Sequence, residues 1–274
     1  MRRFARACQS AVALAAILAS AHVAGAQVYP DVHEVPRSTD PAVLGASATL
    51  REVHERFRIG LEAFGRNDWG AARDEFRQIV TLKPAEPLGS TAHYDLGVTL
   101  TNLHDYAGAR AQFEAAIALD PDFLAARSNL VTVELLGNDL GAARKSAAEL
   151  VNRAPQSARG QYLSGLAALR SGDADVAARA FGALLSHNPS YATAHYDLAL
   201  AEIQLSRYDD AERELRVAIT LAPKYSRARF ALGTVLLKGG KRDEARSAFE
   251  QAAKDSDDPQ LTSLATSMVQ AMAH

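Results

Sequence analysis

Residues 94–121 read YDLGVTLTNLHDYAGARAQFEAAIALDP, and this stretch decides the fold because its pattern returns at a nearly constant spacing. The proline that ends it belongs to a series whose members are 37, 34, 34 and 34 residues apart: Pro84, Pro121, Pro155, Pro189 and Pro223. A period of about 34 residues is typical of solenoids built from pairs of helices. The sequence therefore predicts an all-α chain of repeated helix–turn–helix units.

Residues of matched size keep the same places in the copies. A pair similar to Leu-Gly recurs at Ile59-Gly60, Leu96-Gly97, Leu198-Ala199 and Leu232-Gly233. A small residue follows about twelve positions later, at Ala72, Ala109, Ala143, Ala177, Ala211 and Ala245. A mostly bulky residue lies four positions further on, at Phe76, Phe113, Ala147, Phe181, Leu215 and Phe249. Small residues allow two helices to cross closely, and we expect the bulky side chains to fill the space between neighbouring repeats.

In these residues the chain resembles the tetratricopeptide repeat family over about residues 53–258. The resemblance implies a right-handed superhelical solenoid of about six repeats. They are expected near residues 53–86, 90–123, 124–157, 158–191, 192–225 and 226–258. Repeat three departs from the pattern, because Val131 replaces the glycine and Ala147 replaces the aromatic residue.

An aspartate recurs at the expected turn between the two helices of four repeats: Asp68, Asp105, Asp139 and Asp173. The carboxylate of such a residue can accept a hydrogen bond from a backbone N–H in the first turn of the following helix. We therefore predict that these aspartates are N-caps. An acidic binding site is the alternative interpretation.

Residues 1–26 are predicted to be a secretory signal peptide. Arg2, Arg3 and Arg6 form a basic start, residues 11–21 are apolar, and Ala24-Gly25-Ala26 suits cleavage. An uncleaved membrane anchor is the alternative. The only cysteine, Cys8, lies inside this segment, so the mature chain would form no disulfide. This pattern predicts export from a bacterial cell, to the periplasm or, alternatively, to the outside.

The two ends of the solenoid follow from local patterns. Residues 27–48 contain three prolines and are expected to form an extended arm. The solenoid is expected over residues 49–258, opened by a capping box of Thr49 and Glu52. Residues 259–274 place apolar side chains at three- and four-residue spacing, which predicts an amphipathic helix that caps the last repeat. A docking helix for a partner is the alternative role.

Composition and motifs favour binding over catalysis. The full chain has a net charge of −2, and without residues 1–26 it has 27 basic against 32 acidic residues, a balance that does not suit a nucleic-acid partner. His33-Glu34 and His54-Glu55 begin like a zinc-binding helix motif, but an arginine, Arg37 or Arg58, stands four residues after each histidine. We therefore predict no enzyme activity, no metal site and no cofactor.

The first helix of each repeat is expected to face a concave groove, as the resemblance implies. Five aromatic residues precede the Leu-Gly position: Phe57, Tyr94, Tyr162, Tyr196 and Phe230. Four aliphatic residues lie one turn further along: Leu61, Val98, Leu166 and Leu200. Four basic residues add positive charge towards the C-terminal half: Arg159, Arg170, Arg227 and Lys238. These thirteen residues form the predicted partner-binding groove, and ordinary packing between repeats is the alternative for the aromatic ones.

The sequence thus predicts a scaffold that binds a peptide or helix of an envelope protein. The alternative is a constitutive accessory or regulatory subunit of an envelope enzyme, secretion or assembly complex. After signal cleavage no membrane span is expected, because the apolar run lies within residues 1–26. The oligomeric state and the identity of the partner are left open.

Overall fold

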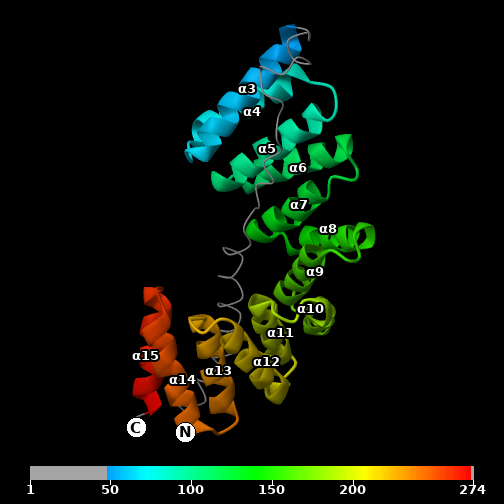
Figure 1. The fold of residues 1–274 in the computed structure, drawn as a ribbon. Helices are drawn as coiled ribbons and strands as arrows, with labels where there is room; N and C mark the ends of the chain where they lie inside the picture. Colours follow the sequence, from blue (N-terminus) through cyan, green and yellow to red (C-terminus); the bar gives the residue numbers. More distant parts are fainter. Residues whose placement is uncertain (1–47, 273–274) are drawn as a thin grey trace. The chain divides into compact units, whose positions relative to one another are not determined.

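The computed structural model describes residues 48–272, which form thirteen α-helices and no strand (Figure 1). The predicted signal peptide and nearly all of the predicted arm lie outside these residues. The described chain divides into two compact units, residues 48–154 and 155–272. The boundary between the two units falls at Pro155, one of the phased prolines. It therefore coincides with a repeat boundary in the sequence, where no separate linker stands.

The N-terminal unit holds six helices: α3 (Ala48–Gly65), α4 (Trp69–Leu82), α5 (Leu88–Asn102), α6 (Tyr106–Leu119), α7 (Leu124–Leu136) and α8 (Leu140–Arg153). The C-terminal unit holds seven: α9 (Ala158–Arg170), α10 (Ala174–His187), α11 (Ala192–Gln204), α12 (Tyr208–Leu221), α13 (Ser226–Lys238), α14 (Arg242–Asp255) and α15 (Pro259–Met272). Within each unit, helices pack chiefly against their neighbours in the chain. The predicted all-α repeat solenoid is confirmed, while the handedness of its superhelix stays a prediction.

Both ends of the described chain bear on sequence predictions. Helix α3 already includes Ala48, so Thr49 lies inside its first turn and is not the N-cap that the capping box required. Helix α15 packs on α14 and buries Leu261 and Ala265. This contact suits the capping role predicted for residues 259–274.

The turns between the two helices of each repeat share one backbone conformation. A residue with positive φ, between 59° and 82°, precedes the second helix at the same position of each repeat: Asn67, His104, Asn138, Gly172, Ser206 and Gly240. Directly after it, Asp68, Asp105 and Asp139 accept capping bonds of 2.9–3.1 Å from backbone N–H groups. These three predicted N-caps are confirmed. Asp173 holds the N-cap position of α10, but its side chain makes no capping bond.

The small residue of the Leu-Gly pair is required by an aromatic ring of the same repeat. A Cβ atom at Gly97 would lie 2.7 Å from Cε1 of Phe113, which is closer than real contacts. Gly60, Gly165 and Gly233 meet the same obstacle from a phenylalanine ring at 2.6–2.8 Å. The bulky side chains therefore fill space within a repeat, and the expectation that they also fill the space between neighbouring repeats stays a prediction.

This packing explains the departure in repeat three. Val131 of α7 replaces the glycine and Ala147 of α8 replaces the phenylalanine, and both side chains are fully buried. The two changes have opposite effects on side-chain volume, so valine occupies room that a ring fills elsewhere. The departure that weakened the sequence pattern is thus a compensated exchange.

Polar side chains of four first helices bind the phased prolines that precede those helices. Each donates to the carbonyl oxygen of the proline six residues before it: Arg127 to Pro121 at 2.8 Å, Gln161 to Pro155 at 3.0 Å, His195 to Pro189 at 2.9 Å, and Arg229 to Pro223. A backbone carbonyl past the end of a helix has lost its intrahelical partner, and these donors satisfy it. Sequence reasoning missed the series because its members share only the ability to donate a hydrogen bond.

Candidate partner-binding site

The five aromatic residues of the predicted groove are core residues. Phe57, Tyr94, Tyr162, Tyr196 and Phe230 are each at most 9% exposed. Side chains that are buried to this degree do not offer a surface to a partner. The prediction that they line an accessible face is wrong, and the alternative interpretation, packing, is correct.

The contacts of these aromatic rings give the physical reason. Tyr94 and Tyr162 lie 5.9 Å, between ring centroids, from the phenylalanine of their own repeat, and Phe230 lies 5.1 Å from Phe249. A second ring, in the turn before the next first helix, adds a further contact, as Tyr191 does for Tyr162 at 5.4 Å. Aromatic pairs at such distances stabilise a core beyond the area they bury. A residue pattern alone cannot tell this role from a binding role.

The remaining residues of the predicted groove do not form one exposed patch. Val98, Leu166 and Leu200 are buried, and Leu61 is half-buried. Among the basic residues, only Lys238 is exposed; Arg159, Arg170 and Arg227 are half-buried. Burial lowers the pKa of Arg170, and Arg227 lies 3.8 Å from a carboxylate oxygen of Asp258 at the start of α15.

Hydrogen bonds between successive repeats join the tyrosines to polar residues of the next first helix. In the N-terminal unit, Asn129 donates to the Tyr94 hydroxyl at 3.1 Å. In the C-terminal unit, the Tyr162 hydroxyl donates to the Asp197 carboxylate at 2.8 Å. Asp197 is fully buried, and this burial raises its pKa to about 7. Burial also raises the pKa of Asp95, on α5, to about 8.

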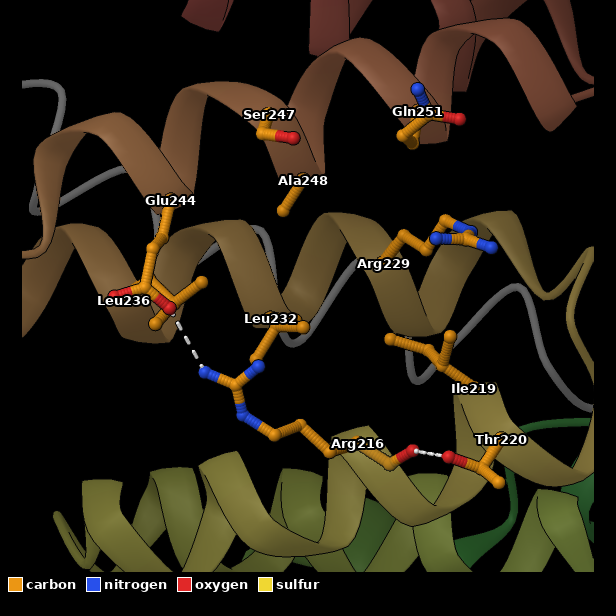
Figure 2. A pocket seen from close by; sticks show the side chains of 10 residues that line it. All are labelled: Arg216, Ile219, Thr220, Arg229, Leu232, Leu236, Glu244, Ser247, Ala248 and Gln251. Atoms are coloured by element: carbon orange, nitrogen blue, oxygen red, sulfur yellow. Dashed lines mark hydrogen bonds and ion pairs between the residues drawn. The ribbon is translucent and has the colours of Figure 1, made fainter.

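An open groove of mixed polarity lies elsewhere, between α12, α13 and α14 (Figure 2). Its volume is about 480 Å³, within the range of roughly 300–1,000 Å³ that is common for binding pockets. Leu232 and Leu236 of α13 contribute apolar side chains between the two outer helices, Ile219 comes from α12, and Ala248 comes from α14. The remaining lining residues are polar or charged: Arg216, Thr220, Arg229, Glu244, Ser247 and Gln251. We call this set of ten residues the α12–α14 groove.

Ion pairs fix the charged side chains at the edges of the groove. Arg216 of α12 reaches across to Glu244 of α14 at 3.1 Å, and it also binds Glu212 one turn earlier at 2.8 Å. These hydrogen bonds raise the pKa of the Arg216 guanidinium and lower that of the Glu212 carboxyl. Arg229 lies 3.1 Å from a carboxylate oxygen of Asp255. The groove therefore combines an apolar floor with a polar rim, an arrangement found at protein interfaces.

The described residues hold neither a cluster of metal-binding side chains nor a helix that could span a membrane. His54 is buried in α3, and Arg58, which breaks the motif, pairs with Glu55 and Glu62. Among residues 48–272 no three side chains of the metal-binding types come together. No helix in this range is long and apolar enough to cross a bilayer.

Comparisons with known proteins agree with this architecture. Family models of the tetratricopeptide repeat match residues 100–167 and 206–268, and a further one matches residues 162–226. Together the matches span residues 100–268, more than half of the chain. A search of curated proteins finds no match.

Solved structures share the fold at low identity. A thermophilic tetratricopeptide repeat protein of Thermus thermophilus is 24% identical with a TM-score of 0.55, and the match covers 66% of this chain and 99% of that one. YrrB, a repeat protein described as having an unusual peptide-binding site, is 14% identical with a TM-score of 0.55; the match covers 70% and 97%. A repeat protein from Parabacteroides merdae is 14% identical with a TM-score of 0.59; the match covers 82% and 100%. With the phased residues and the helix pairs, these matches show that the chain belongs to the tetratricopeptide repeat family.

Proposed function

We propose that this protein is a non-catalytic protein–protein interaction scaffold of the bacterial cell envelope, and that it binds a peptide or helix of a partner protein. The observation that carries the proposal is the α12–α14 groove, which offers an apolar floor on a family fold that is generally used for binding. A peptide-binding site is known in the structurally similar YrrB. The proposed envelope location depends on the signal peptide predicted for residues 1–26.

The occupant that suits this groove is a short helix or extended segment with two or three apolar side chains. The apolar surface that a partner can reach comes from Ile219 of α12 and Ala248 of α14, which are half-buried, because Leu232 and Leu236 beneath them are only 8% and 2% exposed. The exposed polar residues Thr220, Ser247 and Gln251 can hydrogen-bond to the backbone of such a segment at the rim. Burial of the apolar anchors would supply most of the affinity.

Site-specific photo-crosslinking in the native cell tests the groove. A photoreactive residue is placed at Ser247, on the rim, and a control at Lys145, the residue 102 positions earlier on α8. We expect one dominant crosslinked protein from position 247 and little or none of it from position 145. Equal crosslinking at both positions, or none at either, contradicts the proposed site.

Fractionation of the cells tests the location separately. We expect the protein in the periplasmic fraction, with a mass that corresponds to a chain starting at Gln27. A full-length chain in the cytoplasm contradicts the envelope role and leaves the groove experiment intact. Full-length protein in the membrane fraction would favour the uncleaved anchor.

One observation favours the alternative of a permanently assembled subunit. Leu119 and Leu124 are 47% and 42% exposed on either side of the turn between α6 and α7. Exposed large apolar side chains close together can mark a permanent interface. Gel filtration with light scattering separates the two roles, because a scaffold with an exchangeable partner purifies as a stable monomer and an obligate subunit self-associates or aggregates.

A further inference from the structure

An ion pair crosses the α12–α14 groove at the end where Leu236 lies (Figure 2). Arg216 of α12 and Glu244 of α14 meet at 3.1 Å, and both helices pack on α13, which lies between them. The two charged side chains line the groove together with Leu232 and Leu236. They are 49% and 56% exposed, so the pair lies on the solvent side, whereas the leucines are buried.

Leucines at the same place in other repeats are less well covered. Leu130 of α7 and Leu198 of α11 correspond to Leu232, and both are more exposed than its 8%. In those repeats the places of the charged pair are held by residues that cannot form one: Glu114 and Ala142 around α7, and Gly182 and Asp210 around α11. The lower exposure of Leu232 thus accompanies the ion pair above it.

A second ion pair between the outer helices does not explain the difference, because both units have it. Glu212 of α12 binds Lys241, directly before α14, at 3.0 Å. At the same places of the N-terminal unit, Arg110 of α6 binds Asp139, directly before α8, at 2.9 Å. Leu130 is nevertheless the more exposed leucine. The pair that the C-terminal unit has in addition is the one between α12 and α14 that lines the groove.

From this geometry we infer that the Arg216–Glu244 pair is a strap, which closes one end of the α12–α14 groove in the free protein and opens to admit a partner. The inference rests on the proposed function, because it describes how that same groove is opened. Opening the strap gives a partner access to Leu232 and Leu236, so the apolar floor becomes larger than in the closed form. Exposed ion pairs contribute little to stability in water, so the strap opens at small cost.

The strap also favours one chemistry in the partner. When the pair separates, the Arg216 guanidinium loses Glu244 and keeps only the carboxylate of Glu212. A guanidinium forms its strongest hydrogen bonds with carboxylates. A partner segment that carries an acidic side chain beside its apolar anchor can therefore take the place of Glu244 as the strap opens.

Thiol labelling of the purified protein tests the strap without any partner. In the full-length chain Cys8→Ser removes the only cysteine, and Leu232→Cys then provides a single thiol under the strap. The rate of its reaction with N-ethylmaleimide, an uncharged reagent, is measured with the strap intact and after Glu244→Gln or Arg216→Gln. Each of these two variants should raise the rate about two- to fivefold, because each removes one half of an exposed ion pair.

Two controls separate access from other effects. Glu244→Gln and Arg216→Gln change the local charge in opposite directions, so an effect on the ionisation of the thiol cannot raise both rates. Leu130→Cys places the thiol at the same position 102 residues earlier, where no strap lies above it. Its labelling rate should be the same in all three backgrounds.

Salt provides a readout in which the strap itself is not mutated. A concentration of about 1 M screens exposed charges beyond about 3 Å, so it should raise the labelling rate at position 232 with the strap intact and change it little after Glu244→Gln. Unchanged rates in both variants, changes of opposite direction, or an equal rise at position 130 would overturn the inference. None of these results affects the crosslinking from Ser247, which tests the proposed function separately.

Discussion

Helices α6–α8 and α12–α14 occupy the same places in the repeat, 102 residues apart, yet the charges of one three-residue ion-pair cluster are reversed. In the N-terminal unit Arg110 binds Glu114 at 2.9 Å and Asp139 at 2.9 Å. In the C-terminal unit the residue at the place of Arg110 is Glu212. It binds Arg216 at 2.8 Å and Lys241 at 3.0 Å, at the places of the two acids. The same ion-pair geometry is kept with every sign inverted.

The difference extends to the residues between the outer helices. Where α13 has Leu236, α7 has the buried acid Glu134, and where α14 has Ala248, α8 has Ser146. The Ser146 hydroxyl donates to the Glu134 carboxyl group at 3.2 Å, and Arg110 Nε lies 3.8 Å from Oε1 of the same carboxyl group. One repeat scaffold thus supports a polar contact in one unit and an open groove of mixed polarity in the other. Side chains at a few positions, and not the fold, therefore decide where a partner could bind.

The largest expected effects come from substitutions that disturb the packing of Gly233 of α13 against the Phe249 ring of α14. Gly233→Val places a side chain against the Phe249 ring, where a Cβ would lie 2.8 Å from Cδ1. We expect a loss of about 3 kcal/mol in the free energy of unfolding, because overpacking forces neighbouring side chains to shift. Denaturant unfolding with two-state analysis measures it.

A double-mutant cycle sharpens that result. Gly233→Val with Phe249→Ala reproduces the Val131 and Ala147 arrangement of repeat three, so its cost should be smaller than the sum of the two single costs. Additive costs would contradict the compensation argument. Phe249→Ala alone serves as the control for the cavity, at about 3–5 kcal/mol.

The next effect concerns Glu134, a buried acid of the N-terminal unit. Burial raises the pKa of Glu134 to about 7, and its Oε2 atom has no hydrogen-bond partner among the described residues. The ordinary glutamate value is about 4.3, so stability should fall as the pH rises from about 4 to about 7. Glu134→Leu with Ser146→Ala copies the C-terminal unit and should gain on the order of 1–2 kcal/mol at pH 8.

The pH dependence of the gain in this variant shows whether the gain comes from removing the charge. Its advantage over wild type should shrink when unfolding is measured at pH 4, because the wild-type carboxyl group is then neutral in both states. A gain of equal size at both pH values would assign the effect to packing and not to the charge.

Sequence reasoning reached the architecture through residues whose roles are set by geometry. Prolines at a constant period and small residues at helix crossings have one common structural explanation, so the repeats and the N-caps Asp68, Asp105 and Asp139 could be predicted. The aromatic face could not, because Tyr162 and Tyr196 present the same pattern whether they pack or bind. The α12–α14 groove was missed because its residues come from three helices and share no chemical type.

The smallest effect compares the first turns of α8 and α14. Asp139 accepts a capping bond from Ala142 at 3.1 Å, whereas Lys241 holds the same place on α14 with no side-chain cap. Asp139→Ala should cost about 1 kcal/mol, and Lys241→Ala should cost less than about 0.5 kcal/mol. Denaturant unfolding of both variants measures the difference, and equal costs would show that ion pairs and not capping dominate at this position.

The apolar floor of the groove is tested most directly by repeating the crosslinking from Ser247 in an Ile219→Glu background. Ile219 is half-buried, so this substitution places a charge where a partner can meet it, and Arg216 nearby on α12 can partly balance the new charge. If the floor binds the partner, the dominant crosslink from position 247 should be lost, while the protein remains at its normal level in the cell. An undiminished crosslink to the same protein would show that the partner does not use the floor, and would contradict the assignment of binding to the α12–α14 groove.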